Sequence, residues 1–353
     1  MERISVGLVG VTGYTGMELA RLLEGHPRFE LTAATSRTEC GKVLQDIYPF
    51  LRHCRTGMCP VVEPDPAVLA QQCALVFLAV PHGAAQEMAA ALRGRGVKVV
   101  DLSADFRLRD PEVYREWYNQ PHEQQHLLED AVYGLPEMYA HALQGASLVA
   151  NPGCYPTSAI LGLWPALANG LVSTQGIIID AKSGASGAGR KAQTATLFCE
   201  VADTFRAYNL GRHRHTPEIE QELSALAGAP VVVNFSPHLL PMNRGILSTI
   251  YTMLSPEGLA LGADGLRQAY ANHYAGHPFV RVLPAGMLPE TRHVRGTMFC
   301  DIAVVPDART GRLLIVSAID NLCRGASGQA VANANLMLGL PLTAGLVFAP
   351  AMP

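Results

Sequence analysis

Short apolar runs alternate with amphipathic helical patterns over the first 150 residues of the chain. The apolar runs span residues 4–10, 29–36, 73–80, 97–104 and 147–151. The segments 14–26 and 83–96 carry apolar residues at three- and four-residue spacing, with a glycine near the end of each, which is typical of amphipathic helices. Strands that alternate with helices indicate βαβ units, so we predict an α/β fold with a parallel sheet in this region.

The pattern changes from residue 177 onward, where longer strand-like runs follow one another with fewer helices between them. These runs span residues 177–183, 231–240, 245–254, 297–305 and 312–322. They predict a second domain built on a mixed or antiparallel sheet. A last helical pattern at 325–340 fits against either domain, and its periodicity alone does not decide between them.

Composition and charge limit the classes of function. A chain of 353 residues with 49% hydrophobic and 16% charged residues suits two compact globular domains. A formal net charge of -3, without a long Lys/Arg run, argues against nucleic acid or an anionic membrane as partner and favours a small molecule. The amino terminus lacks the layout of a secretory signal, and no stretch reaches the roughly 18 apolar residues of a membrane span, so we expect a cytoplasmic protein.

A glycine pattern follows the first predicted strand and opens the first predicted helix. Its spacing is G-x-x-G-x-x-G, at Gly10, Gly13 and Gly16. Such a turn lets the backbone approach a pyrophosphate, and the helix amino terminus offers free N–H groups and a positive dipole. We therefore predict a dinucleotide site here, rather than a merely tight turn, with further donors from Thr12, Tyr14 and Thr15.

The end of the second predicted strand indicates which dinucleotide is bound. An NAD-preferring enzyme often carries an acidic residue there, whereas this chain has Ser36, Arg37 and Thr38. A cation beside small hydroxyls suits a 2′-phosphate, so we predict NADP(H); the alternative is that Arg37 is a solvated loop charge. The turn at 79–85 follows another strand, so we expect Pro81 to line the same crevice, whereas His82 is as well explained by a structural role.

One of the eight cysteines stands in an unusual context. The others are scattered without a C-x-x-C pair or zinc-type spacing, and several lie in apolar runs typical of buried cysteines. Cys154 follows a predicted strand and the turn residues Pro152 and Gly153, and Pro156 suits the first position of the next helix. A helix amino terminus lowers a thiol pKa and supplies N–H groups to an oxyanion, so we predict a nucleophile; a buried structural cysteine is the alternative.

A nucleophilic cysteine needs a proton acceptor and donor, and the segment 211–220 offers two histidines. His213 and His215 alternate on an apparently extended approach to a helix that we expect to be capped by Thr216, with Pro217 at its first position. Glu218 and Glu220 are available to orient an imidazole. A solvated basic loop is the alternative, and we predict no metal site because His-x-His supplies only two ligands.

Several motifs together resemble the N-acetyl-gamma-glutamyl-phosphate reductases. They are GxxGYTGxEL (10–19), DLSADFR (101–107), YGLPE (133–137), NPGCYPT (151–157), KSGASGAGR (182–190), HRHTPEI (213–219), PHLLPMNRGIL (237–247) and NLCRGASGQAVANANLM (321–337). The resemblance implies a Rossmann-type NADP-binding domain over 1–150, joined by the carboxyl-terminal segment 325–353. It also implies a mixed α+β catalytic and dimerisation domain of the semialdehyde dehydrogenase type over 151–324, and a homotetramer or homodimer.

The same resemblance implies a reaction of arginine biosynthesis. Cys154 would attack the acyl phosphate, release phosphate and form a thioester that is reduced by NADPH to the 5-semialdehyde. We assign the acid–base imidazole to His215, with His213 as the near alternative. Asn321 resembles the family's nicotinamide-contacting end, whereas Asn333 and Asn335 have a structural alternative as ordinary polar residues of a helix.

The anionic ends of such a substrate need partners. The glycine-rich loop 183–190 is predicted to cradle phosphate or nicotinamide through backbone N–H groups, Ser183, Gly184, Ser186 and Arg190. Candidates for the substrate carboxylate are Arg107, Arg212, Arg214 and Arg244, although Arg107 is equally suited to holding a turn. An N-acetyl-aminoadipyl-phosphate reductase of lysine biosynthesis shares most of these motifs and is the alternative function. A cofactor sensor without catalysis is disfavoured because the cysteine and both histidines are present.

Overall fold

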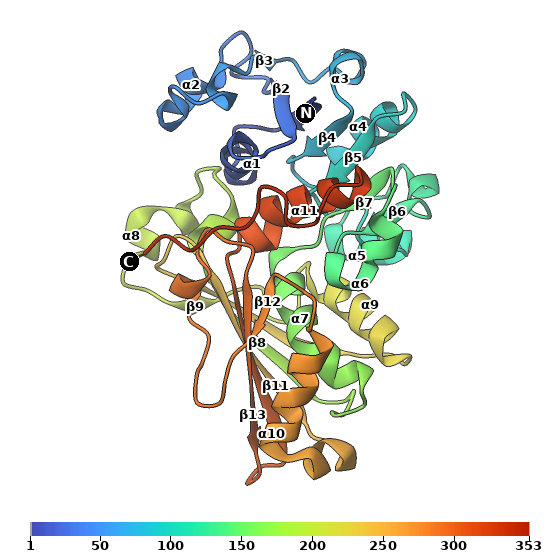
Figure 1. Cartoon of the computed structure of the whole chain (residues 1–353), viewed down its shortest axis with the longest axis vertical. Helices are drawn as coiled ribbons and strands as arrows, with labels where there is room; N and C mark the ends of the chain where they lie inside the picture. Colours follow the sequence, from blue (N-terminus) through green and yellow to red (C-terminus); the bar gives the residue numbers. More distant parts are fainter. Residues whose placement is uncertain (1, 353) are drawn as a thin grey trace. The chain divides into compact units, whose positions relative to one another are not determined.

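The computed structural model describes residues 2–352, which form two compact units. One unit runs up to Pro152 and resumes at Ala326–Phe348, and the other comprises Gly153–Gly325 and the residues after Phe348. The elements of both are labelled in Figure 1. The chain therefore leaves the first unit directly before Cys154 and returns to it after Gly325.

The sheet of the first unit has seven strands in the order β3-β2-β1-β4-β5-β7-β6, and every neighbouring pair is parallel. The strands are β1 (Ile4–Val9), β2 (Phe29–Thr35), β3 (Val61–Val62), β4 (Leu75–Leu78), β5 (Lys98–Asp101), β6 (Ala131–Tyr133) and β7 (Leu148–Ala150). This confirms the predicted parallel sheet. Sequence analysis missed β3 and β6, because two or three residues are too few to show a strand period.

The helices of the first unit outnumber the three predicted from periodicity, at 14–26, 83–96 and 325–340. They are α1 (Tyr14–Glu24), α2 (Leu44–Ile47), α3 (Pro66–Gln72), α4 (Ala85–Arg93), α5 (Pro111–Tyr118), α6 (Pro136–Leu143) and α11 (Gly328–Met337). Two of the missed helices, α3 and α5, begin at an Asp-Pro pair whose aspartate caps the first turn, which is a recognisable start signal.

Helix α11 packs against α1, α6 and β5, so the carboxyl-terminal helix belongs to the first unit. Its two asparagines are buried and bonded inside that unit. Asn333 donates to the carbonyl of Gly134 at 2.8 Å and to Asn151 Oδ1 at 3.0 Å. Asn335 Oδ1 lies 3.0 Å from His26 Nε2. These contacts fit the structural interpretation of both residues.

The sheet of the second unit also has seven strands, in the order β12-β13-β14-β11-β8-β10-β9. They are β8 (Ile177–Gly184), β9 (Arg206–Ala207), β10 (Val233–Leu240), β11 (Ile246–Met253), β12 (Val280–Val282), β13 (Cys300–Asp307) and β14 (Arg312–Ile319). The pairs β8–β10 and β12–β13 are parallel and the other four are antiparallel. The predicted mixed sheet is confirmed.

The helices of the second unit lie largely against α7 (Cys154–Ala168), which packs on the sheet. The other helices are α8 (Phe198–Val201), α9 (Thr216–Ala227) and α10 (Pro256–His273). Helix α7 packs on β11 and β14 and against α9 and α10. Buried residues alternate along β8, β10 and β11 with half-buried or exposed ones such as Ile178 and Tyr251. One face is therefore in the core and the other is open in the single chain.

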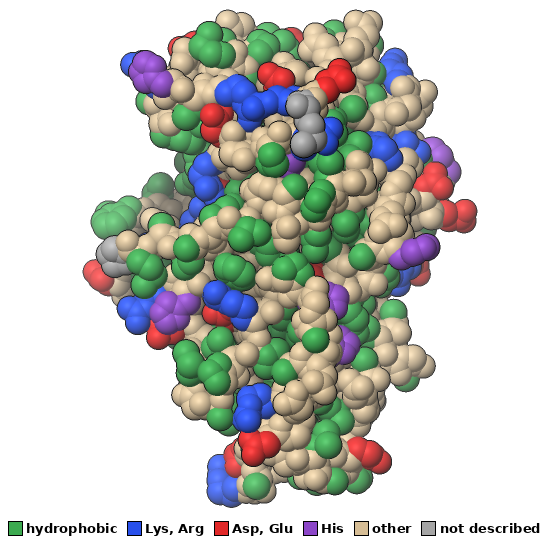
Figure 2. All heavy atoms as spheres, viewed as in Figure 1, with side chains coloured by type: hydrophobic (Ala, Val, Ile, Leu, Met, Phe, Trp, Pro, Cys, Tyr) green, Lys and Arg blue, Asp and Glu red, His purple; other side chains and the backbone are tan. Residues whose placement is uncertain are grey.

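No helix within residues 2–352 is both long enough and apolar enough to cross a bilayer. On the face drawn in Figure 2, Lys and Arg side chains are interspersed with Asp and Glu.

Candidate functional site

The glycine turn after β1 leaves space at one of its three glycines. A Cβ on Gly10, whose φ is +88°, would lie 2.3 Å from the carbonyl oxygen of Ala79, and one on Gly16 would lie 2.5 Å from that of Gly10. A Cβ on Gly13 would meet only the carbonyl oxygen of Gly10, at 3.8 Å. The packing of the chain therefore requires Gly10 and Gly16 but not Gly13. The second glycine of such a turn is the one that lets a pyrophosphate approach the backbone.

Helix α1 begins directly after this turn with its positive end available to an anion. Among residues 2–352, no side chain forms a capping hydrogen bond at Gly13, where α1 starts. The first turn of α1 contains no acidic residue. Strands β1 and β4 are neighbours, while the chain continues from β1 to β2 on one side and from β4 to β5 on the other. Ligands of open α/β sheets bind at such a reversal of strand order. The predicted Thr12, Tyr14 and Thr15 are half-buried around this turn.

Residues 36–38, which follow β2, include no acidic side chain that could bind the ribose 2′-hydroxyl of NAD. Ser36 is buried and its hydroxyl lies 3.3 Å from Thr38 Oγ1, whereas Arg37 is exposed. The nearest acid in sequence, Glu39, pairs with Lys42 at 2.6 Å. The chemistry of these residues suits a 2′-phosphate, and their contact with it stays a prediction.

The turn after β4 is held by a buried aspartate that sequence analysis did not single out. Asp105 accepts hydrogen bonds from the N–H groups of Gly83 at 2.7 Å and Ala85 at 3.0 Å, at the start of α4. His82 Nδ1 accepts the N–H of Ala104 at 3.0 Å, which supports its structural interpretation. The exposed Pro81 belongs to this turn, so Asp105 fixes the backbone next to the predicted cofactor contact. The motif DLSADFR was the available signal.

Cys154 is the first residue of α7 and is half-buried. The first helical turn closes on Gly153, whose carbonyl accepts from the N–H of Thr157 at 3.0 Å and from its hydroxyl at 2.9 Å. The N–H of Gly153 donates to Glu218 Oε1 at 2.8 Å. The prediction that Pro156 occupies the first position is wrong, because the helix begins two residues earlier. The thiol thus lies at the positive end of the helix dipole, which stabilises a thiolate.

The two histidines lie together beside the aromatic residue that follows Cys154. The ring centroids of His213 and His215 are 4.9 Å apart. The ring centroid of Tyr155 lies 5.5 Å from that of His213 and 6.0 Å from that of His215. His213 Nδ1 accepts the backbone N–H of His215 at 3.1 Å. Burial, and to a smaller extent the charge of Arg214, lowers the pKa of His213 to about 4. His213 is therefore neutral at pH 7.

The predicted start of α9 needs correction. Thr216 does not cap the helix but is its first residue. His215 precedes it with helical angles (φ −81°, ψ −11°), because the N–H of Thr216 already bonds the carbonyl of His213 at 2.9 Å. The approach is therefore a turn and not extended chain. Glu220 accepts the N–H of Val233 at 3.0 Å and Glu218 that of Gly153, so both carboxylates receive backbone donors.

The glycine-rich loop after β8 forms a short 3-10 turn over Ala185–Ala188. The prediction of a backbone cradle is wrong for four of its N–H groups. Those of Gly184, Ala185, Ser186 and Gly189 donate to carbonyls of the chain itself, at 2.8–3.1 Å. Ser183 is buried and donates to the carbonyl of Gly184 at 3.1 Å. The Ser186 hydroxyl accepts from Asn321 Nδ2 at 3.0 Å. Asn321 therefore has a structural contact with the loop.

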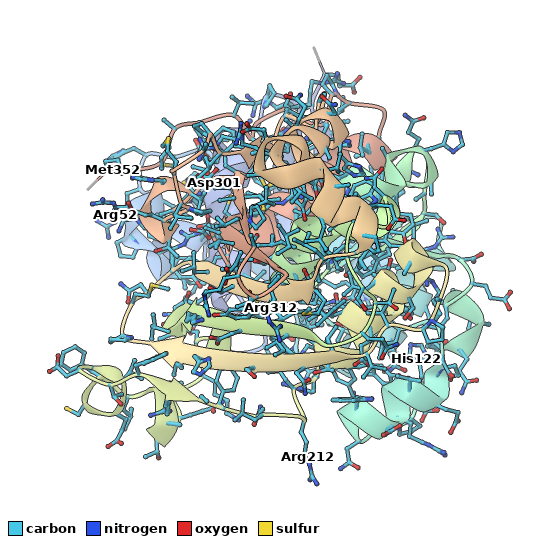
Figure 3. All side chains as sticks on the ribbon, turned by 90° about the horizontal axis from the view of Figure 1, so that it is seen from below. Arg52, His122, Arg212, Asp301, Arg312 and Met352 are labelled. Atoms are coloured by element: carbon cyan, nitrogen blue, oxygen red, sulfur yellow. The ribbon has the colours of Figure 1, made fainter. Side chains whose placement is uncertain are left out.

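The structure separates the predicted arginines by their surroundings. Arg107 is buried in the first unit and donates to the carbonyls of Asn151 at 2.8 Å and Leu102 at 2.9 Å, so it braces a turn. Arg244 is half-buried and ion-paired with Asp320 at 3.0 Å. Arg190 and Arg212 are exposed in the second unit, and Arg212 extends away from the ribbon (Figure 3). Arg214 is exposed as well, so three of the predicted arginines lie at the surface of the second unit.

Comparison with protein families divides the chain at the same cysteine. Residues 5–146 match the family model described as semialdehyde dehydrogenase, NAD binding domain. Residues 154–321 match the family model described as semialdehyde dehydrogenase, dimerisation domain. The match thus changes from one domain to the other just before Cys154.

Two relatives that match over nearly the whole chain carry the same name. An N-acetyl-gamma-glutamyl-phosphate reductase of Desulforudis audaxviator is 54% identical, with 98% of each chain covered. That of Geobacter sulfurreducens is 52% identical over 97% of this chain and 98% of its own. Among solved structures, aspartate semialdehyde dehydrogenase II of Vibrio cholerae matches with a TM-score of 0.70 at 16% identity, over 96% of this chain and 99% of that chain. This last likeness concerns the fold alone.

Proposed function

Because the chain belongs to the N-acetyl-gamma-glutamyl-phosphate reductase family of semialdehyde dehydrogenases, we propose that Cys154 is the nucleophile of this reaction. The substrate is N-acetyl-gamma-glutamyl phosphate, and the products are N-acetyl-L-glutamate 5-semialdehyde and phosphate, in arginine biosynthesis. The position of Cys154 at the start of α7 carries the proposal. The names of the relatives do not favour the lysine-pathway alternative.

The first half of the reaction transfers the acyl group to the enzyme. The Cys154 sulfur attacks the acyl carbonyl carbon after giving its proton to His215, and a C–S bond forms. The tetrahedral oxyanion then collapses. The bond between the acyl carbon and the phosphate oxygen breaks, inorganic phosphate leaves, and a thioester remains on Cys154. The dipole of α7, whose positive end lies at Cys154, favours both the thiolate and the oxyanion.

The first unit holds the reductant. The glycine turn at Gly13 and the start of α1 bind the pyrophosphate, and Ser36 and Arg37 contact the 2′-phosphate, which selects NADPH over NADH. The family's NAD binding domain and the space above Gly13 support this assignment. When bound, NADPH supplies the hydride that reduces the thioester carbon. The buried Asp105 keeps the turn that carries Pro81 in place.

The second half of the reaction releases the aldehyde. The reduced carbon carries an oxyanion and a C–S bond, and the aldehyde forms as that bond breaks. His215 returns the proton to sulfur, and general acid catalysis of this kind typically contributes about 10²- to 10⁴-fold. His213 acts through His215 instead: it is half-buried and neutral, and its Nδ1 accepts the backbone N–H of His215. This division of roles favours His215 over the near alternative.

The substrate's carboxylate needs a cation in the second unit. We assign it to Arg190 or Arg212, which are exposed there, and place Ser186 beside the departing phosphate. A guanidinium binds a carboxylate through two parallel hydrogen bonds. Asn321, Ser183 and Gly184 then shape the nicotinamide side of the site through the loop they stabilise.

The open face of the second sheet supports a homodimer as the minimal assembly. It bears exposed apolar side chains such as Ile178 and Met253, and a cavity of about 450 Å³ lined in part by Asp180, His238 and Tyr251. The family model over this unit is a dimerisation domain. A second copy of the chain is the proposed occupant, and Ile178→Lys should convert the dimer to monomers in light scattering. A mass unchanged by this substitution would place the interface elsewhere.

We assign the reaction to the cytoplasm because its nucleophile must stay a thiol. The cytosol keeps thiols reduced, and the eight cysteines of the chain are all free in the structure. Attaching a fluorescent protein and locating it in cells of the source organism tests this assignment.

The test of the function is phosphate-dependent NADP reduction by the purified protein. N-acetyl-glutamate 5-semialdehyde is compared with its homologue one carbon longer and with aspartate semialdehyde. A strong preference for the first is expected. Preference for the longer substrate would move the reaction to lysine biosynthesis. Cys154→Ser should abolish turnover while NADPH binding, followed by fluorescence, is retained; turnover by this variant would refute the nucleophile assignment.

A further inference from the structure

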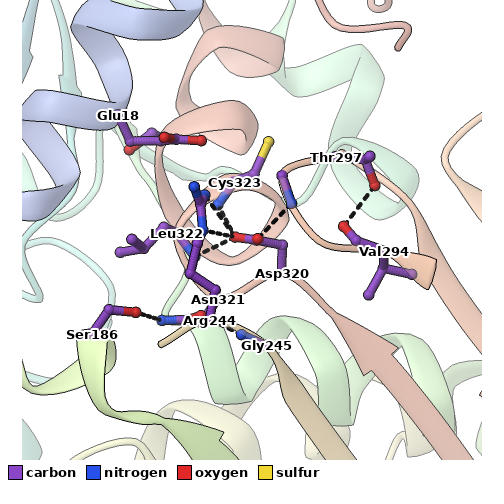
Figure 4. A network of polar contacts seen from close by, with 12 residues as sticks. Glu18, Ser186, Arg244, Gly245, Val294, Thr297, Asp320, Asn321, Leu322 and Cys323 are labelled. Carbon is purple, nitrogen blue, oxygen red and sulfur yellow. Dashed lines mark hydrogen bonds and ion pairs between the residues drawn. The ribbon is translucent and has the colours of Figure 1, made fainter. Parts of the chain in front are cut away.

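A completely buried carboxylate lies at the end of β14, a few residues before the chain leaves the second unit. Asp320 has none of its surface exposed. Its Oδ1 accepts from the N–H groups of Leu322 at 2.8 Å and Cys323 at 2.7 Å, and from Arg244 Nη2 at 3.0 Å. Its Oδ2 accepts the N–H of Gly296 at 2.6 Å. Figure 4 shows Asp320 at the centre of these contacts.

The next residue extends the same network to the loop that carries Ser186. Asn321 Oδ1 accepts the N–H of Gly245 at 2.7 Å, and its Nδ2 donates to Ser186 Oγ at 3.0 Å. The carbonyl of Gly245 in turn accepts the N–H of Gly184 at 2.9 Å. Two consecutive buried side chains therefore join segments 184–186, 244–245 and 320–323, which lie far apart in the sequence (Figure 4).

The turn that Asp320 organises ends against Cys154. The carbonyl of Asp320 accepts the N–H of Gly325 at 2.9 Å, closing the turn 320–325. A Cβ on Gly325 would lie 2.6 Å from Cys154 Cβ and 3.0 Å from Cys154 Cα. The backbone of Gly325 thus packs directly on the cysteine, and only glycine leaves room for it.

We propose that Asp320 and Arg244 are a positioning pair, which fixes Cys154 through the turn 320–325 and Ser186 through Asn321. The inference rests on the proposed nucleophilic role of Cys154. It gives Arg244 a role different from the predicted contact with the substrate carboxylate. A displacement of a reacting group by about 1 Å costs on the order of 100-fold in rate, so the precision of this turn is worth a large part of the activity.

A second buried Asp–Arg pair in the same unit supplies the control. Asp301 is 3% exposed and receives Arg281 through two hydrogen bonds, at 2.6 and 2.9 Å. It joins β12 and β13 and not the turn 320–325. Asp320→Asn and Asp301→Asn therefore each remove the charge of a buried aspartate, and each leaves a partly exposed arginine without its carboxylate.

The experiment measures the alkylation of Cys154 by iodoacetamide against pH, resolved from the other thiols by peptide mass spectrometry, together with kcat and KM. D320N is expected to slow alkylation at pH 7 about tenfold and kcat about 100-fold, with KM for NADP changed by less than about threefold. D301N is expected to leave all three within about twofold, whatever its effect on the melting temperature.

Two results would overturn the proposal. One is a folded D320N whose Cys154 reacts at the rate of the unsubstituted chain. The other is a D301N that slows alkylation as much as D320N does, since the effect would then be a general loss of stability. If D320N does not fold by circular dichroism, Gly325→Ala acts on the last link alone and should slow alkylation, and an unchanged rate contradicts the proposal. Alkylation needs no turnover, so these outcomes are distinct from a failure of the proposed reaction.

Discussion

The two units build their parts of the site from different materials. In the first unit the candidate cofactor site is made of backbone: a turn of three glycines, a free helix start and a strand end without carboxylates. In the second unit the candidate catalytic site is made of the side chains of Cys154, His213 and His215. Polar contacts of buried residues such as Asp320 and Glu218 hold these side chains in place. A substitution therefore impairs the backbone site when it adds atoms that block the cofactor. It impairs the side-chain site when it removes a reacting group or a residue that positions that group.

The largest effect is expected at His215. His215→Ala should lower kcat about 10²- to 10⁴-fold while the fold and NADPH affinity are kept, because the variant removes a proton donor from the second unit only. His213→Gln should cost less, since an amide still accepts the His215 N–H. Steady-state kinetics of both variants decide the assignment. An equal or greater loss in H213Q would make His213 the acid–base group.

Two glycines of the same turn should respond in opposite ways. Gly16→Ala is expected to lower the free energy of unfolding by about 3 kcal/mol, because the added methyl lies 2.5 Å from the carbonyl oxygen of Gly10. Gly13→Ala should leave that free energy within about 0.5 kcal/mol, since its Cβ has space, and weaken NADPH binding instead. Chemical denaturation and cofactor titration measure the two. A destabilised G13A with unchanged NADPH affinity contradicts the fit of the cofactor.

The half-buried His213 should make the second unit sensitive to acid. Its pKa in the folded chain, about 4, lies below the ordinary histidine pKa of 6.5 that applies when the chain is unfolded. The stability associated with neutral His213 is therefore fully present above pH 6.5 and is lost as the pH falls toward 4. At pH 4.5 we expect the free energy of unfolding to be lower by about 2–3 kcal/mol for this reason.

The measurement is the difference between the unsubstituted chain and H213Q in denaturation at pH 7 and pH 4.5. The difference is needed because other groups titrate in this range. Among them is Asp101 of the first unit, where burial and the neighbouring Asp105 raise the pKa to about 7, with the opposite sign. Identical pH slopes for the two proteins would show that His213 is not held neutral.

The smallest effect is expected at the end of β2. Arg37→Ala should reduce the preference for NADPH over NADH about tenfold, or about 1.4 kcal/mol, because the 2′-phosphate loses its cation. Arg52→Ala removes another exposed arginine of the same unit and should leave the preference unchanged. Ratios of kcat/KM for the two cofactors give the answer. If the ratio is the same in R37A as in the unsubstituted chain, Arg37 does not bind the 2′-phosphate and is a solvated charge of the loop.

Sequence was informative where the determinant is local. The glycine spacing, the strand-to-helix position of Cys154 and the two-domain pattern all depend on neighbouring residues, and the parallel and mixed sheets followed from them. The helix starts at Cys154 and Thr216 were displaced by one or two residues, as helix ends often are. The predicted phosphate cradle is wrong for four N–H groups. Three of them bond to residues 242–245, a partner that no local pattern reveals, and that of Gly189 bonds to Ser186 within the loop.

Asp320 and Asp105 escaped sequence analysis for the same reason. Each gains its role from segments that meet only in the folded chain: Asp320 from Arg244 and Gly296, and Asp105 from the start of α4. Composition and spacing show an acidic residue in both places but not its burial. The space at Gly13 is likewise a property of the folded turn.

The nucleophilic role of Cys154 is tested by trapping the acyl-enzyme. The protein is mixed with freshly prepared N-acetyl-gamma-glutamyl phosphate without NADPH, quenched in acid and digested for mass spectrometry. The account predicts an N-acetyl-glutamyl adduct on the peptide that contains Cys154, which disappears as the semialdehyde forms when NADPH is added. An adduct on any other residue, or rapid turnover with no adduct at Cys154 in the absence of NADPH, would contradict it.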